Sequence, residues 1–163
     1  MNPLPSIISF LREIGIPIRE DTIPDETFLP GLCISHGTLV FDRALLKWPG
    51  DLLHEAGHIA VTPAAQRHQL DDRLSGEIEA PHAGETEATA WSFAAATHLG
   101  LPLSELFHSG GYRGCGDRLV FTFASGCYPG AAGLAAAGLT ATGADARAAG
   151  VLPFPHMLRW LRA

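Results

Sequence analysis

The chain has 163 residues, of which 47% are hydrophobic and 17% are charged, and its formal net charge is −6 at pH 7. These values exclude an intrinsically disordered chain, and the length fits one domain with a single core. The acidic balance, with no cluster of Lys and Arg to offset it, argues against a nucleic-acid surface and against an anionic membrane surface.

The chain shows no pattern typical of export or membrane insertion. Residues 1–15 have no basic start, and Arg12 and Glu13 interrupt their short apolar run, so we expect no signal peptide. The weakly polar stretch at 124–139 is too short and too rich in Ala and Gly to span a bilayer. The three cysteines form no CxxC pair, which is typical of reduced thiols. We therefore expect a soluble, cytoplasmic protein.

The N-terminal elements are a helix and a hairpin. Apolar residues recur at helical spacing over 7–14, until a glycine and a proline end the pattern. Two β-prone runs follow at 31–35 and 38–42, and the His36-Gly37 pair between them predicts a hairpin. Residues 43–48 are expected to form a short helix.

The following segments alternate between helix and loop. After the helix at 51–61, discussed below, residues 66–84 are polar and aperiodic and are interpreted as a long loop, of a length that is often functional. Residues 85–99 are rich in Ala, begin with acidic residues and end before Gly and Pro, which predicts a helix. A further helical turn is expected at 103–108, and residues 117–125 fit either a strand or a helix.

The C-terminal third is expected to be mostly helical. Ala and Gly dominate residues 131–150, and the residues after Pro155 predict a final helix. The whole pattern indicates an α+β class, in which a small antiparallel hairpin packs on two helices. The core would span about 31–102, and an Ala/Gly-rich helical part would span about 117–163.

The segment DLLHEAGHIAVT, residues 51–62, carries two histidines four positions apart, with a glutamate directly after the first. Asp51 is a suitable N-cap, and the proline after the segment ends the helix before it. His54 and His58 therefore leave one face of a short helix and offer half of a tetrahedral zinc shell. Glu55, about 100° around the helix, would lie beside the open position of the metal, where a general base is needed.

The neighbours of these polar residues support a buried helix. They are mostly apolar, and burying His, Glu and His without a partner would cost several kcal/mol, which a bound metal avoids. Gly57 costs about 1 kcal/mol relative to Ala in a helix, and we expect another element to approach closely there. The alternative is an ordinary helix with two hydrogen-bonded histidines, because HExxH also occurs by chance. A metzincin would carry His at Ala64, so that subclass is excluded.

A third metal ligand is expected from the helix at 85–99. Glu85 and Glu87 both lie in its first turn, about 200° apart, so they cannot both face one metal. Acidic residues are also stabilised there by the helix dipole without any metal.

HEAGH followed by ETEATAWSFAAATHLGLP resembles the ImmA/IrrE-type zinc metallopeptidases, and more broadly the gluzincin branch of the zincins, over roughly residues 31–102. In that pattern the glutamate three residues before an alanine is the third zinc ligand. With Ala88 as that alanine, the resemblance implies Glu85. Related patterns often carry Asn or Asp at the position of Thr89.

The resemblance implies a compact zincin-like fold and a zinc metallopeptidase, in which Zn²⁺ is held by His54, His58 and Glu85. A metal-activated water would hydrolyse a peptide bond, with Glu55 as general base. The partner would be a peptide or protein substrate, which the hairpin at 31–42 could take along an edge strand. The alternatives are a non-catalytic, zinc-stabilised binding or regulatory module of the same fold, and a metal-free α+β domain.

Other side chains are weaker candidates. Peptide deformylases also combine a strand cysteine with HExxH, but the spacing of Cys33 matches them poorly, so a buried strand cysteine is the better interpretation. His68, His82 and His108 are each expected to be solvated loop residues. Tyr112, in a glycine-rich segment, would either stabilise an oxyanion or anchor a turn, and the turn is the preferred interpretation.

Overall fold

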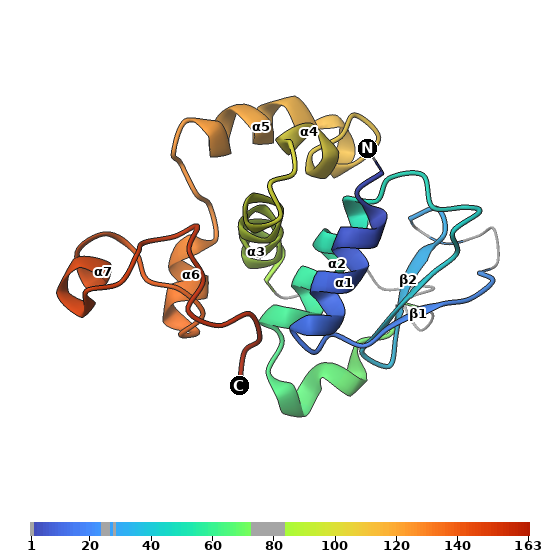
Figure 1. Cartoon of the computed structure of the whole chain (residues 1–163), viewed down its shortest axis with the longest axis horizontal. Coiled ribbons are helices and arrows are strands. Elements are labelled where there is room, and N and C mark those ends of the chain that lie inside the picture. Colours follow the sequence, from blue (N-terminus) through green and yellow to red (C-terminus); the bar gives the residue numbers. More distant parts are fainter. Residues whose placement is uncertain (1, 24–26, 28, 73–83) are drawn as a thin grey trace.

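The structure is a computed structural model that describes residues 2–23, 27, 29–72 and 84–163. The first half contains α1 (Leu4–Glu13), β1 (Ile18–Glu20), β2 (Leu32–Ser35), β3 (Thr38–Phe41), α2 (Asp51–Val61) and the 3₁₀ helix η1 (Ala64–Gln69). The second half contains α3 (Glu85–His98), α4 (Leu103–Leu106), the 3₁₀ turn η3 (Tyr112–Gly114), α5 (Gly116–Ala124), α6 (Ala131–Ala136) and α7 (Gly143–Ala149). The fold class is therefore α+β, with the small sheet beside α1 and α2 (Figure 1).

The sheet is mixed and has the strand order β1-β3-β2. The predicted hairpin is confirmed: β2 pairs antiparallel with β3, with Leu32 opposite Phe41. His36 and Gly37 both have positive φ, which is typical of the two-residue turns that match strand twist. The parallel pairing of β1 with β3 was not predicted, since three residues carry too little pattern to recognise a strand.

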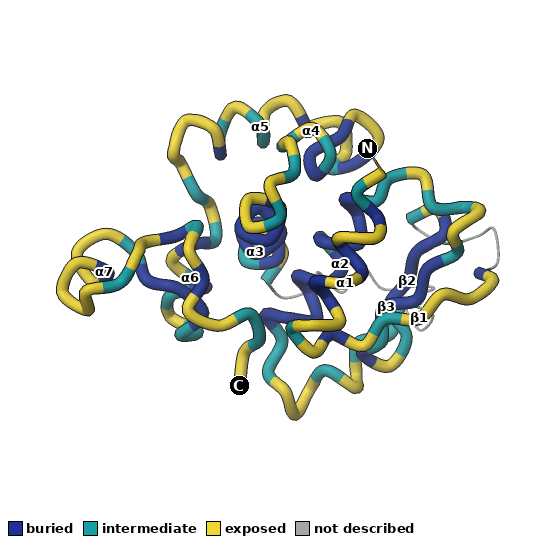
Figure 2. Tube along the Cα trace, in the orientation of Figure 1, coloured by how far each residue is buried: buried dark blue, intermediate teal, exposed yellow. Residues whose placement is uncertain are grey.

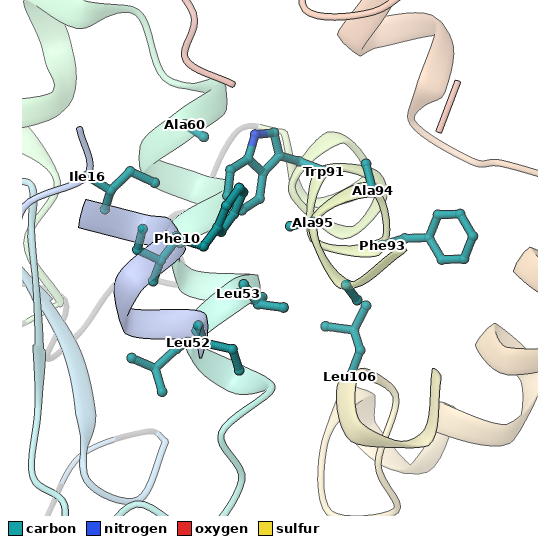
Figure 3. Packing of buried hydrophobic residues seen from close by; sticks show 14 of the residues in the cluster. Phe10, Ile16, Leu52, Leu53, Ala60, Trp91, Phe93, Ala94, Ala95 and Leu106 are labelled. Atoms are coloured by element: carbon teal, nitrogen blue, oxygen red, sulfur yellow. The ribbon is translucent and has the colours of Figure 1, made fainter. Parts of the chain in front are cut away.

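The core forms where α1, α2 and α3 pack together, and α2 packs most extensively on α3 (Figures 1 and 2). Nine consecutive residues of α3, from Ala88 to Ala96, are buried, so this helix is enclosed on all sides and central to the fold. Phe10, Leu53 and Trp91 meet where these three helices converge (Figure 3).

The end of the chain docks against the central helices. Met157 forms an isolated bridge with Thr140, and the carbonyl of Trp160 accepts the indole N–H of Trp91 at 2.9 Å. The backbone N–H of Arg162 donates to the last turn of α2. The prediction of a final helix after Pro155 is therefore wrong, because these backbone groups serve contacts with distant residues.

Residues 43–48 form turns and irregular structure, so the prediction of a short helix there is also wrong. The carboxylate of Asp42 accepts hydrogen bonds from the backbone N–H groups of Ala44 and Ile23, which favours a turn over a helix. Residues 117–125, which fitted a strand or a helix, belong almost entirely to α5. The helical turn predicted at 103–108 is confirmed as α4. Of the long loop predicted at 66–84, residues 73–83 lie outside the described residues.

None of the helices in the part of the chain that the structure describes is long and apolar enough to cross a bilayer.

The backbones of α2 and α3 touch at Gly57. A Cβ added to Gly57 would lie 2.7 Å from the carbonyl oxygen of Ala88 and 3.1 Å from its Cα. Both distances involve backbone atoms, which cannot rotate away as a side chain can. The close approach that the sequence predicted at Gly57 is therefore confirmed, and α3 is the element that makes it.

We predict that Gly57→Ala destabilises the protein by about 1–3 kcal/mol, the usual range for overpacking, although Ala is normally the better helix former. The free energy of unfolding is measured by urea titration on the metal-free protein, with an unchanged m-value as the criterion for comparison.

Ser9, exposed in the middle of α1, provides the matched control. At this position Ser9→Ala is expected to be more stable than Ser9→Gly by about 1 kcal/mol, because alanine has the higher helix propensity. If Gly57→Ala also raised the stability, the steric contact with Ala88 would be refuted.

Candidate metal centre

The helix α2 begins and ends as local chemistry requires, with one difference. Thr62 has extended backbone (ψ 134°), as expected before a proline. The N-cap residue is Gly50 and not the predicted Asp51. Position 50 requires a glycine, because a Cβ there would collide with the carbonyl oxygen of Glu105. Asp51 is instead the first helical residue, and its carboxylate receives a 2.7 Å hydrogen bond from Nε2 of His108.

The structure brings the side chains of His54, His58 and Glu85 together. The two Nε2 atoms of the histidines are 3.3 Å apart. The carboxylate of Glu85 spans them, with one oxygen 3.2 Å from Nε2 of His54 and the other 3.2 Å from Nε2 of His58. Among the described residues, this is the one group of three His, Cys, Asp or Glu side chains that could hold a metal ion.

These distances fit one tetrahedral ion. Zinc binds nitrogen and oxygen ligands at about 2.0–2.1 Å, so neighbouring ligand atoms of a tetrahedron are separated by about 3.3 Å. Two imidazoles and one carboxylate are also a common ligand set of catalytic zinc sites. In the absence of a cation, the same atoms form an ion-pair cluster in which both histidines donate to Glu85.

Glu87 does not face this group. Its carboxylate accepts a 3.0 Å hydrogen bond from the hydroxyl of Thr86, and a Cβ on Gly133 of α6 would collide with it. The separation of Glu85 and Glu87 around α3 is therefore the one expected from helical geometry. Of the two glutamates, Glu85 is the one on the side of α3 that faces α2.

Glu55 is buried next to the histidine pair. Burial raises the pKa of its carboxyl to about 7, against the opposing influence of His54, and the carboxylates of Asp72 and Glu85 raise it further. A carboxylate that titrates near neutrality is well suited to take and return a proton.

Hydrogen bonds from His54 and His58 hold the pKa of Glu85 well below its usual range. Burial alone would lower the pKa of His54, but Glu85, Glu55 and Asp51 outweigh it and raise this pKa. The surroundings of His54 and Glu85 therefore favour opposite charges on this imidazole and this carboxylate, and the attraction between them holds the two groups together.

The remaining candidate side chains do not belong to the group of His54, His58 and Glu85. Cys33 is buried in β2 with Ile23 and Val40, as interpreted from the sequence. His68 is exposed on η1, and His82 lies outside the described residues. The prediction of a solvated His108 is wrong, because its ring is buried between Asp51 and the stacked indole of Trp48.

Sequence reasoning missed the pair formed by Asp51 and His108. The two residues are far apart in the chain, and each has an ordinary local explanation, a helix start and a loop. It also left Tyr112 as a turn residue. Tyr112 does form a turn, with φ +52°, but its hydroxyl lies 3.5 Å from Nδ1 of His54. Burial raises the pKa of Tyr112 well above its usual value.

Within the described part of the chain, the strand β2 lies at an edge of the sheet, and it contacts α2. The backbone N–H of Ile34 donates to the carboxylate of Asp72 at 2.7 Å, so a side chain satisfies this edge position. The charge of the same Asp72 carboxylate raises the pKa of Glu55, so Asp72 acts electrostatically on the candidate base.

Comparisons of the chain with protein-family models, with curated proteins and with solved structures give no match.

We predict that Glu85→Gln weakens zinc binding by more than the 10–100-fold typical of losing an outer-shell partner, because it removes the charge of a direct ligand. Zinc per chain is measured by elemental analysis on protein without a histidine tag, and the affinity by competition with a chelator. Wild-type protein is expected to hold about one zinc ion.

Glu87→Gln is the matched control, since it makes the same chemical change two residues away on a carboxylate that faces α6. It should bind zinc as the wild type does. Equal losses in the two variants, or no zinc in the wild type, would rule out this metal centre.

Proposed function

We propose that the protein is a zinc-dependent peptidase of the zincin type, as the resemblance of its motifs to ImmA/IrrE-type metallopeptidases implies. The observation that carries the proposal is the convergence of His54, His58 and Glu85 at the mutual distances of one tetrahedral ion. Three protein ligands are the number found in catalytic zinc sites, which keep one position for water or substrate.

His54, His58 and Glu85 would hold the zinc ion, which would supply Lewis-acid chemistry for activating a water and polarising a carbonyl. The part of this chain in the reaction falls to Glu55. Its carboxylate takes the proton from the attacking water and returns it to the nitrogen of the leaving amine. Burial supports this role, because it raises the pKa of Glu55 to about 7, where both the accepting and the donating form are available.

A peptide substrate is supported by the position of β2. An extended peptide can add to a free sheet edge through main-chain hydrogen bonds. Here a peptide carbonyl would take the place of the Asp72 carboxylate at the N–H of Ile34. Because β2 contacts α2, a peptide on this edge would lie beside the helix that carries Glu55.

A non-catalytic zinc module is the second candidate, and the contact between Asp72 and Ile34 favours it, because this contact occupies the edge that a substrate needs. In a module of this kind, metal removal would lower the melting temperature, while a peptide library would remain uncut at all metal concentrations.

We predict that Glu55→Gln retains zinc and lowers the rate of peptide cleavage by at least about 100-fold, because the amide cannot accept the proton. Cleavage is measured on a peptide library by mass spectrometry, at equal zinc occupancy in the variant and the wild type. Glu87→Gln serves again as the control and should cleave normally. Cleavage by Glu55→Gln at the wild-type rate would refute the proposed mechanism.

A further inference from the structure

Tyr112 contacts Nδ1 of His54, the ring nitrogen that does not face His58 and Glu85. Its hydroxyl lies 3.5 Å from Nδ1 of His54, and the two rings meet edge to face with centroids 5.3 Å apart. Nε2 of the same imidazole faces His58 and Glu85. Tyr112 is therefore behind the ligand and not among the groups that would face a substrate.

We propose that Tyr112 is a positioning residue, whose hydroxyl oxygen accepts the Nδ1–H of His54 and holds the imidazole in the tautomer that presents Nε2 to a metal. The inference rests on the proposed zinc site and adds to it a residue that resemblance does not provide. It also differs from the oxyanion role that the sequence left open, since the hydroxyl lies at Nδ1.

The chemistry of a metal-bound histidine requires such a partner. A neutral imidazole carries one proton, so a metal at Nε2 requires the proton to be on Nδ1. That N–H normally donates to a carbonyl, a carboxylate or a water, and the acceptor orients the ring. The distance of 3.5 Å is at the long limit of a hydrogen bond. Coordination makes the N–H a stronger donor, so the contact is expected to shorten when zinc binds.

Tyr112 also links α2 to α3, the helix of the third ligand. The side chain of Ser92, which is fully buried in α3, acts on this hydroxyl and partly offsets the rise in the pKa of Tyr112. The hydroxyl of Ser92 donates to the carbonyl of Thr89 at 2.8 Å, and that of Thr89 donates to the carbonyl of Glu85 at 2.9 Å. A series of polar contacts through Tyr112, Ser92 and Thr89 therefore connects His54 with the backbone of Glu85.

The fold holds Tyr112 in a conformation that requires support. Both Tyr112 and Arg113 have φ near +52°, and left-handed backbone costs a non-glycine residue about 1–2 kcal/mol. The preceding Gly111 fits against the ring of His108, where a Cβ would lie 2.9 Å from Cε1. Because His108 is hydrogen-bonded to Asp51, the buried pair connects this turn to the start of α2.

The alternative is that Tyr112 only anchors the turn. Its ring packs edge to face on Phe107, with centroids 5.2 Å apart, and this contact needs no hydroxyl. Tyr112→Phe keeps the ring and removes only the oxygen, so it separates the two roles.

The test compares Tyr112→Phe with Tyr128→Phe, the same change at the other tyrosine of the chain. Tyr128 packs on Phe93, Phe123 and Phe154. Zinc affinity is measured by chelator competition, and the melting temperature is measured on metal-free protein. We expect Tyr112→Phe to weaken zinc binding about 10–100-fold, the usual effect of losing an outer-shell partner, and Tyr128→Phe to leave it unchanged.

Wild-type zinc affinity in Tyr112→Phe would overturn the positioning role and leave the zinc site intact. Absence of zinc binding in the wild type would overturn both.

A second measurement does not depend on the folding of Tyr112→Phe. In Tyr128→Phe, Tyr112 is the single tyrosine, so the tyrosine doublet in its ultraviolet resonance Raman spectrum reports the hydrogen bonding of Tyr112 alone. Zinc should shift the intensity ratio of the doublet toward a phenol that accepts a stronger hydrogen bond. An unchanged ratio would overturn the proposal.

Discussion

The contact between the backbones of α2 and α3 at Gly57 and Ala88 determines the geometry of the candidate centre. His54 and His58 flank Gly57 on one helix, and Glu85 lies three residues before Ala88 on the other. With a Cβ at Gly57 only 2.7 Å from the carbonyl oxygen of Ala88, the helices would have to separate. The candidate ligand atoms of His54, His58 and Glu85 lie 3.2–3.3 Å apart because the two helices come this close. The small residues of α3 also permit close packing, since they allow other elements to approach this helix.

Polar groups collect around this contact in an otherwise apolar interior. Asp51, Glu55, His58 and His108 are all buried, and buried charges are costly unless they are paired. Asp51 and His108 pair with each other, and His58 contacts Glu85. Perturbed carboxylates of this kind are concentrated in functional sites more than in structural ones. The burial that raises the pKa of Glu55 is therefore part of the case for its role in proton transfer.

The zinc and metal-free interpretations use the same atoms. Both place the Glu85 carboxylate across two Nε2 atoms, and they differ in whether protons or a cation lie between them. Tyr112 bears on this difference, because an acceptor at Nδ1 of His54 favours the tautomer in which Nε2 is free to coordinate. The peptidase and the binding module differ elsewhere, at the edge of β2, where Asp72 and a peptide carbonyl would compete for the N–H of Ile34.

The sequence by itself determined what depends on neighbours in the chain. The helix carrying HEAGH, its end at Thr62, the hairpin turn at His36-Gly37 and the common face of His54 and His58 follow from spacing, turn chemistry and a proline. Only the tertiary structure decided that Glu85 and not Glu87 meets the histidines, that Asp51 pairs with His108, and that Tyr112 lies behind His54. It also drew the last residues into contacts with α2 and α3 in place of a helix. These outcomes depend on how closely two helices approach, and the position of each partner is set by packing between segments that are far apart in the chain.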